Sequence, residues 1–192
     1  MDFSQIEDRG LVMLGCGKMG SAMLQGWLGQ GLPPSAVWVM DPAPSPWVEE
    51  SGAQVNAPLP AAPAIVIVAV KPQTMAEALP TLAGFGGGAT LFISVAAGTS
   101  LATYAQMLGP ATPVVRAMPN TPAAIGQGIS ALIGSHAATE AHLKAAEGLL
   151  SAVGQTVRLA NETQMDAVTG LSGSGPAYVF HMIECLAAAG QA

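Results

Sequence analysis

Three glycines near the start of the chain have the spacing of a phosphate-binding turn. Gly15, Gly17 and Gly20 form G-x-G-x-x-G within LVMLGCGKMGSAMLQGWLGQG (11–31), between an apolar run and a helix-like segment. In this setting the first glycine allows a tight turn, the second lets a pyrophosphate approach the backbone, and the third lets helix and strand pack closely. The helix N-terminus adds N–H donors and positive potential. An ordinary tight turn is the alternative, but the strand–turn–helix context favours dinucleotide binding.

Asp41 adds a second feature of a nucleotide site, because it ends the next apolar run, 21 residues after Gly20. An acidic side chain at this place binds the ribose hydroxyls of the adenosine and repels a 2′-phosphate. No arginine follows directly that could accept such a phosphate. The pattern therefore favours NADH over NADPH. Alternatively, DPAPSP (41–46) is a turn in which the aspartate bonds its own backbone.

These residues need a sheet that presents its strand ends at one edge, and the apolar pattern predicts one. The strands read as continuous runs of Val, Ile and Ala, so helices should cover both faces, as in a parallel, doubly wound α/β sheet. Thr74 with Glu77 has the spacing of a capping box, and Ser100 can cap the helix that follows it. We expect strands at 11–14, 37–40, 54–55, 65–70, 90–95, 114–117, 129–133 and 156–159, and helices at 19–30, 46–51, 74–82, 101–108 and 139–153.

The pattern changes near residue 160. Residues 1–160 are expected to form a Rossmann-type dinucleotide-binding domain with a mostly parallel sheet. Asn161 and Gln164 offer another helix cap, and residues 161–192 read as helix with one break at SGSGP (172–176). We interpret this second part as the beginning of an all-helical domain that is cut short.

The composition argues against several classes of function. Apolar residues make up 51% of the 192 residues and charged residues 9%, which is typical of a well-buried globular chain. The longest apolar run, residues 61–70, is half of what a bilayer span needs, about 20 residues, and it contains a proline. The net charge of −6 and the scattered Lys and Arg argue against nucleic acid. Cysteine and histidine spacing predicts no metal site. The polar N-terminus is no targeting signal, so we expect a cytoplasmic protein without a membrane partner.

Four further segments carry a specific resemblance. VAVKPQ (68–73), SVAAGT (94–99), VRAMPNTPAAIGQG (115–128) and DAVTGLSGSGPAYVF (166–180) follow the glycine turn in order. Together they resemble pyrroline-5-carboxylate reductase over residues 11–192, and the last two segments are the specific ones. The resemblance implies hydride transfer from NAD(P)H to the C=N carbon of a cyclic imine, a small-molecule substrate. The product is L-proline, in the last step of proline biosynthesis.

The resemblance also implies roles for single residues. It places AVKP (69–72) and VAAG (95–98) against the cofactor, Asn56 on its adenosine side, MPNTP (118–122) beside the nicotinamide and substrate, and Glu162 near the bound product. The structural alternatives are a rigid polar turn for MPNTP, a helix-start carboxylate for Glu162, and solvated side chains for Lys18 and Lys71. The expected cofactor residues are Leu14, Gly15, Cys16, Gly17, Lys18, Met19, Gly20, Asp41, Asn56, Ala69, Val70, Lys71, Pro72, Val95, Ala96 and Ala97, and the expected substrate-side residues are Asn120, Thr121 and Glu162.

A proton donor for the imine nitrogen is not identified in this chain. No strong acid–base pair is present, and His181 lies on an apolar segment, as a core histidine does. In the family, a Ser-Pro-Gly-Gly-Thr-like stretch holds the substrate carboxylate and supplies a hydroxyl donor, and it would follow Ala192. The resemblance therefore implies a fragment of a longer reductase, impaired on its own, whose missing helices form homo-oligomers.

Two other readings stay open. One is a non-catalytic nucleotide-binding module. The other is a different imine or hydroxyacid reductase on the same scaffold, although the absence of lysine after Asn161 argues against the hydroxyacid class.

Overall fold

The computed structural model describes residues 3–191, which contain an eight-stranded sheet. The strands are β1 (Leu11–Leu14), β2 (Val37–Met40), β3 (Gln54–Val55), β4 (Ile65–Val68), β5 (Leu91–Ser94), β6 (Val114–Met118), β7 (Gly128–Gly134) and β8 (Gly154–Arg158). Their order is β3-β2-β1-β4-β5-β6-β7-β8. Every neighbouring pair is parallel except β6 and β7, which are antiparallel. The chain order reverses between β1 and β4, where ligands of open α/β sheets bind.

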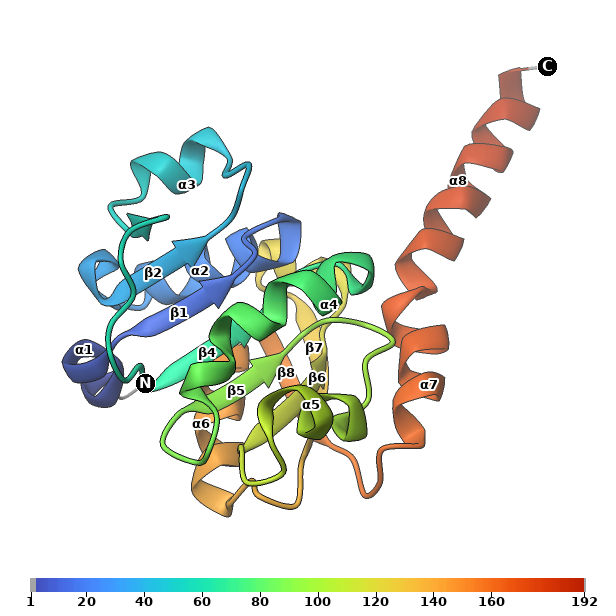
Figure 1. The fold of residues 1–192 in the computed structure, drawn as a ribbon. Coiled ribbons are helices and arrows are strands. Elements are labelled where there is room, and N and C mark those ends of the chain that lie inside the picture. The colour runs from blue at the N-terminus through green and yellow to red at the C-terminus, as the bar shows by residue number, and fades with distance from the viewer. Residues whose placement is uncertain (1–2, 192) are drawn as a thin grey trace.

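Helices cover both faces of this sheet, as expected for strands without a polar face (Figure 1). One face packs against α1 (Ser4–Arg9), α2 (Lys18–Gly29), α3 (Pro46–Glu50) and α6 (Glu140–Ser151). The other packs against α4 (Met75–Ala78), the 3₁₀ segment η3 (Leu79–Phe85) and α5 (Leu101–Leu108). Short 3₁₀ turns lie at η1 (Pro34–Ala36), η2 (Pro72–Thr74) and η4 (Thr121–Ile125).

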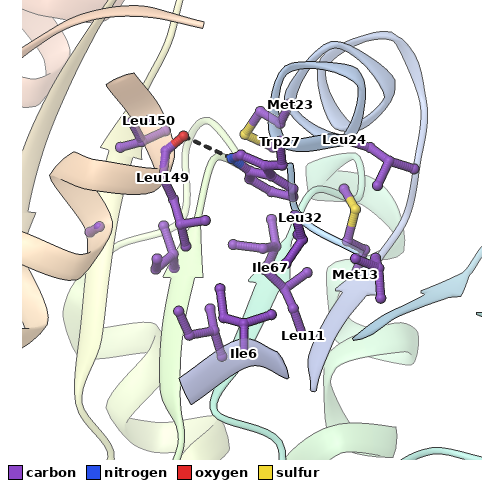
Figure 2. Close-up of a cluster of buried hydrophobic side chains, with 14 of the residues drawn as sticks. Ile6, Leu11, Met13, Met23, Leu24, Trp27, Leu32, Ile67, Leu149 and Leu150 are labelled. Carbon is purple, nitrogen blue, oxygen red and sulfur yellow. Dashed lines mark hydrogen bonds between the residues drawn. The ribbon is translucent and has the colours of Figure 1, made fainter. Parts of the chain in front are cut away.

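The sheet has a hydrophobic core on each face, and alternate residues of each central strand pack into one core or the other. In β1, Leu11 and Met13 enter the core under α2 and α6, whereas Val12 and Leu14 enter the core under α4 and α5. Figure 2 shows the first core, in which the buried Trp27 of α2 donates its indole N–H to the carbonyl oxygen of Leu149 in α6 at 2.8 Å. This bond joins two helices that are distant in sequence, so α2 is held firmly over the sheet.

The helix expected at 74–82 is wrong in its start and its type. The segment begins as η2 and has only four α-helical residues, Met75–Ala78, before η3. Thr74 does not cap it, because its hydroxyl donates to the carbonyl oxygen of Lys71 at 3.0 Å. Pro72 and Pro80 lack the N–H groups that a regular helix needs, which favours short 3₁₀ turns here. Ser100 does cap α5, accepting the N–H of Thr103 at 3.2 Å.

The expected helix break at 172–176 is present as a short interruption. α7 (Gln164–Val168) leads into a π-helical turn, η5 (Thr169–Gly173), and α8 (Gly175–Gln191) begins after the turn residue Ser174. The N–H of Ser174 bonds the carbonyl oxygen of Thr169 at 2.9 Å, so the helix is also widened before this turn. Pro176 lies in the first turn of α8, where a missing N–H is tolerated. α8 projects away from the α/β body (Figure 1).

The N-terminal helix α1 has no counterpart among the expected elements. It is six residues long and buries Ile6, but its sequence carries no repeated apolar spacing. Arg9 attaches its end to the sheet, donating to the carbonyl oxygens of Ala62, Pro63 and Ala89 at 3.1, 3.0 and 2.8 Å. Such contacts between distant segments cannot be inferred from local pattern.

Candidate functional site

The glycine turn lies at the carboxyl end of β1, between the ends of β2 and β4. Gly15 has φ +84°, and a Cβ there would lie 3.0 Å from the carbonyl oxygen of Ala69 and 2.9 Å from the side chain of Val70. A Cβ on Gly20 would lie 3.1 Å from the carbonyl oxygen of Gly15. Both positions therefore need glycine for the fold itself, as the motif predicts.

Gly17 differs from its neighbours, because a Cβ there would meet no atom within 4 Å. Its φ is −69°, which any residue adopts, so the fold does not require glycine. Gly17 is also the N-cap of α2 and offers no side chain to cap that helix. The result is an open cradle at a helix N-terminus, where backbone N–H groups and the helix dipole attract an anion. Lys18 and Met19 follow directly, and Lys18 is exposed.

Asp41 is held in place by its own surroundings. One carboxylate oxygen accepts the N–H of Cys16 at 2.7 Å, and the other accepts the N–H of Ala43 at 2.9 Å. The side chain of Asn56 pairs with the backbone of Asp41, donating to its carbonyl oxygen at 2.8 Å and accepting its N–H at 3.1 Å. Asn56 has φ +50°, a conformation that asparagine tolerates. The glycine turn, Asp41 and Asn56 therefore form one connected unit.

Cys16 lies within this unit, buried at the turn. Its thiol lies 3.8 Å from the hydroxyl of Ser21, which donates to the carbonyl oxygen of Cys16 at 3.0 Å. Burial raises the pKa of the Cys16 thiol, and Asp41 raises it further. A raised pKa keeps the group a neutral thiol, so Cys16 packs as a small apolar side chain.

The ends of β4 and β5 form the next part of the same edge. The N–H of Ala69 bonds the carbonyl oxygen of Leu14 at 2.8 Å, and the N–H of Val95 bonds that of Val68 at 3.0 Å. Val70 and Ala97 are half-buried and Ala96 is buried, whereas Lys71 and Pro72 are exposed. Small side chains thus line this edge of the sheet. Lys71 is exposed to solvent, which agrees with the alternative interpretation of a solvated side chain.

The polar residues after β6 make mostly structural contacts. Asn120 accepts the N–H of Ile129 at 3.0 Å and donates to the hydroxyl of Ser172 at 3.2 Å, so it links the 118–122 turn to the helical segment. Thr121 is exposed at the start of η4.

Glu162 forms an ion pair with Arg116, a residue that was not among the predicted site residues. One carboxylate oxygen accepts from the Arg116 guanidinium at 2.7 Å and from the N–H of Leu101 at 2.8 Å. Tyr104 is fully buried nearby, with its hydroxyl against that of Ser94. Burial raises the pKa of the Tyr104 hydroxyl, so it stays protonated. The sequence feature that could have identified Arg116 is its position as the single charged residue inside the apolar run VVRAM (114–118).

Two hollows lie away from the glycine turn. One of about 260 Å³ lies between β7 and α6, beside Leu132, Leu143 and Arg158, and one of about 290 Å³ lies beside Leu101, Ala105 and Pro110. Neither is bordered by a glycine of the turn. The physical argument for the site therefore depends on the open cradle and the strand edge and not on an enclosed cavity. Among residues 3–191, no cluster of His, Cys, Asp and Glu is placed to hold a metal ion, and no helix is long and apolar enough to cross a membrane.

Comparisons with known proteins agree with this geometry. Residues 162–192 match the family model of pyrroline-5-carboxylate reductase dimerisation, and residues 11–98 match that of NADP oxidoreductase, coenzyme F420-dependent. The chain is 40% identical over 190 residues to a pyrroline-5-carboxylate reductase of Methanosarcina acetivorans, covering 95% of this chain and 70% of that protein.

Two solved structures resemble the fold closely. The reductase from Coxiella burnetii aligns with a TM-score of 0.82 and 28% identity, covering 95% of this chain and 70% of its own. The enzyme from Plasmodium falciparum, solved with NADP bound, aligns with a TM-score of 0.82 and 25% identity, covering 96% of this chain and 70% of its own.

Proposed function

This chain belongs to the pyrroline-5-carboxylate reductase family, and we propose from that membership that it binds NAD(P)H and reduces 1-pyrroline-5-carboxylate to L-proline. The observation that carries the proposal is the open cradle at Gly17. A glycine that the fold does not need, at the N-terminus of a helix, is explained by a ligand that needs its space.

In this function the residues of the chain bind the cofactor and orient it. The N–H groups at the start of α2 bind the diphosphate, and Asp41 with Asn56 forms the adenosine side. The ends of β4 and β5, at 69–72 and 95–97, lie along the edge toward the nicotinamide, and the 118–122 turn borders it. A bound nicotinamide nucleotide supplies the hydride for the imine carbon. Small side chains at this edge let the two rings approach closely, and such alignment lowers the barrier of a two-reactant step.

We also propose that the cofactor is NADH rather than NADPH. Asp41 supports this, and residues 41–57 contain three acidic residues and no Lys or Arg. A 2′-phosphate would therefore meet negative charge without a cationic partner.

We further propose that the chain forms a homo-oligomer through its helical segment, residues 161–192. α8 presents a row of large apolar side chains to solvent, and the dimerisation model matches the same residues. The exposed side chains are Tyr178, Val179, Phe180, Met182, Ile183 and Leu186.

The binding step is tested with Gly17→Val. A Cβ at this position meets no protein atom within 4 Å, so the valine side chain points into the open cradle and we expect NADH affinity to fall at least about tenfold. Valine is a poorer N-cap than glycine, so we expect a melting temperature that is lower by a few degrees in a chain that still folds. Gly29→Val in the same helix is the matched control, because a Cβ on Gly29 also meets no atom within 4 Å. Fluorescence titration with NADH measures binding. Loss of nicotinamide absorbance after addition of pyrroline-5-carboxylate measures reduction. Equal binding by both variants would contradict the proposed site. Binding without reduction, even in a version extended beyond Ala192, would favour a non-catalytic module.

A further inference from the structure

Arg116 is the only charged side chain that is buried among residues 3–191. It lies in β6 with 8% of its side chain exposed, and its guanidinium donates to Glu162 at 2.7 Å. The same carboxylate oxygen accepts the N–H of Leu101, the first residue of α5, at 2.8 Å. One oxygen atom therefore joins β6, α5 and the segment that leads into α7.

The three joined positions each border a segment of the proposed site. Leu101 follows the 95–100 loop, and Arg116 precedes the 118–122 turn by two residues. Tyr104, one turn further along α5, places its hydroxyl against that of Ser94, which in turn accepts the N–H of Ala96 at 3.2 Å. The 95–100 loop is thus held at one end by the buried hydroxyl of Ser94 and at the other by the half-buried carboxylate of Glu162.

Stability alone does not account for this pair. In this pair Arg116 is buried and Glu162 is half-buried, and an ion pair with a buried member gains little over apolar side chains of similar volume, because the cost of desolvation offsets the attraction. Arg116 pairs in the sheet with Ser94 of β5, and Val114, which precedes it by two residues in β6, is buried in the core under α4 and α5. Charged hydrogen bonds are directional, whereas apolar packing is not. The bonds of Glu162 therefore fix the relative positions of β6, α5 and the segment before α7.

We propose that Arg116 and Glu162 are positioning residues that hold the 95–100 loop and the 118–122 turn against the nicotinamide end of the cofactor. This inference rests on the proposed function. The pair lies at β6, separated from β1 and its glycine turn by β4 and β5. It therefore acts on the nicotinamide end and leaves the diphosphate end unaffected.

The test compares two ligands that share the diphosphate end. ADP-ribose lacks the nicotinamide, whereas NADH contains it. In Glu162→Gln, made in the full chain, we expect the dissociation constant of ADP-ribose to stay within about twofold and that of NADH to rise about fivefold, the equivalent of about one hydrogen bond. The rate of hydride transfer should fall about tenfold or more, because misalignment is costly. Glu147→Gln is the matched control, since it removes a carboxylate from the surface pair with Arg158.

A second variant guards against loss of folding. Arg116→Met combined with Glu162→Gln leaves no unpaired buried charge and keeps an amide oxygen for the N–H of Leu101. Its expected result is the same selective loss of NADH affinity. The proposal is overturned if both ligands weaken together in both variants, because the pair then only supports the fold, and equally if neither ligand weakens. Failure of a wild-type protein that also contains the Ser-Pro-Gly-Gly-Thr-like stretch to reduce the imine would contradict the proposed function instead, and the ratio of NADH to ADP-ribose affinity still decides the role of the pair.

Discussion

At the scale of single residues, Gly15 and Gly17 lie two positions apart and are glycine for different reasons. Gly15 has a positive φ and a carbonyl oxygen too close for a side chain, so the backbone dictates it. Gly17 has neither constraint, so a ligand explains it better than the fold does. Asp41 has a structural role, because it accepts the N–H of Cys16 in the turn, and in the proposed function it also adds a negative charge to the adenosine side.

Asp41→Asn should change which nucleotide binds best. The amide keeps an oxygen for the N–H of Cys16 and removes the charge that opposes a 2′-phosphate, at the cost of the bond from the N–H of Ala43. We expect NADPH affinity to rise about fivefold relative to NADH, the equivalent of about 1 kcal/mol for two charges near 4 Å in water. Parallel titrations of both nucleotides measure the ratio, with Glu49→Gln on α3 as the control for general loss of negative charge. An unchanged ratio in Asp41→Asn would show that this carboxylate does not select the cofactor.

At the scale of elements, the residues at the start of a helix decide whether the helix is capped. Ser100 caps α5 as expected, whereas Thr74 does not cap α4, because Pro72 starts a 3₁₀ turn before it. α6 begins with a reciprocal cap in which Thr139 accepts the N–H of His142 and the His142 Nδ1 accepts the N–H of Thr139. A histidine can accept this bond only when its ring is neutral.

This cap should make the stability of α6 depend on pH. Burial lowers the pKa of His142 in the folded chain, so the contribution of the cap is present above the unfolded pKa of about 6.5 and is lost as pH falls through the lower folded value. His142→Gln keeps an acceptor that does not titrate. Relative to this variant, the wild type should lose less than about 1 kcal/mol of unfolding free energy between pH 7 and 5. Urea unfolding at several pH values measures the difference, and His136→Gln, an exposed change before the helix, should leave the pH dependence in place.

At the scale of the whole molecule, α8 stands out among the helices of residues 3–191 by its length and its exposure. It projects from the α/β body (Figure 1), and none of its residues is buried. A helix that is apolar over much of its surface is stable in water when another surface covers it. The segment is therefore better explained as half of an interface than as a free helix.

Charges on α8 should prevent the proposed assembly. Ile183→Lys with Leu186→Lys replaces two exposed side chains, so the single chain has no core contact to lose. Burying both charges in an interface is costly, and we expect the dissociation constant to rise at least about a hundredfold. Sedimentation over a range of concentrations measures the mass. Val157→Lys, an exposed change on the edge strand β8, should leave the assembly unchanged. A mass equal to one chain in the wild type would contradict the proposal.

The sequence by itself determined the alternation of strands and helices, the glycine turn and the acidic residue after β2, because these depend on contacts between near neighbours in the chain. Continuous apolar runs were enough to predict a sheet buried on both faces, and three glycines were enough to locate its ligand edge. Only the tertiary structure decided that Arg9 ties α1 to the sheet, that Asn56 holds Asp41, and that Glu162 joins Arg116 to Leu101. Each of these contacts links residues between 15 and 80 positions apart. Local pattern carries no information about such pairs, since their partners meet only after the strands have taken their order in the sheet.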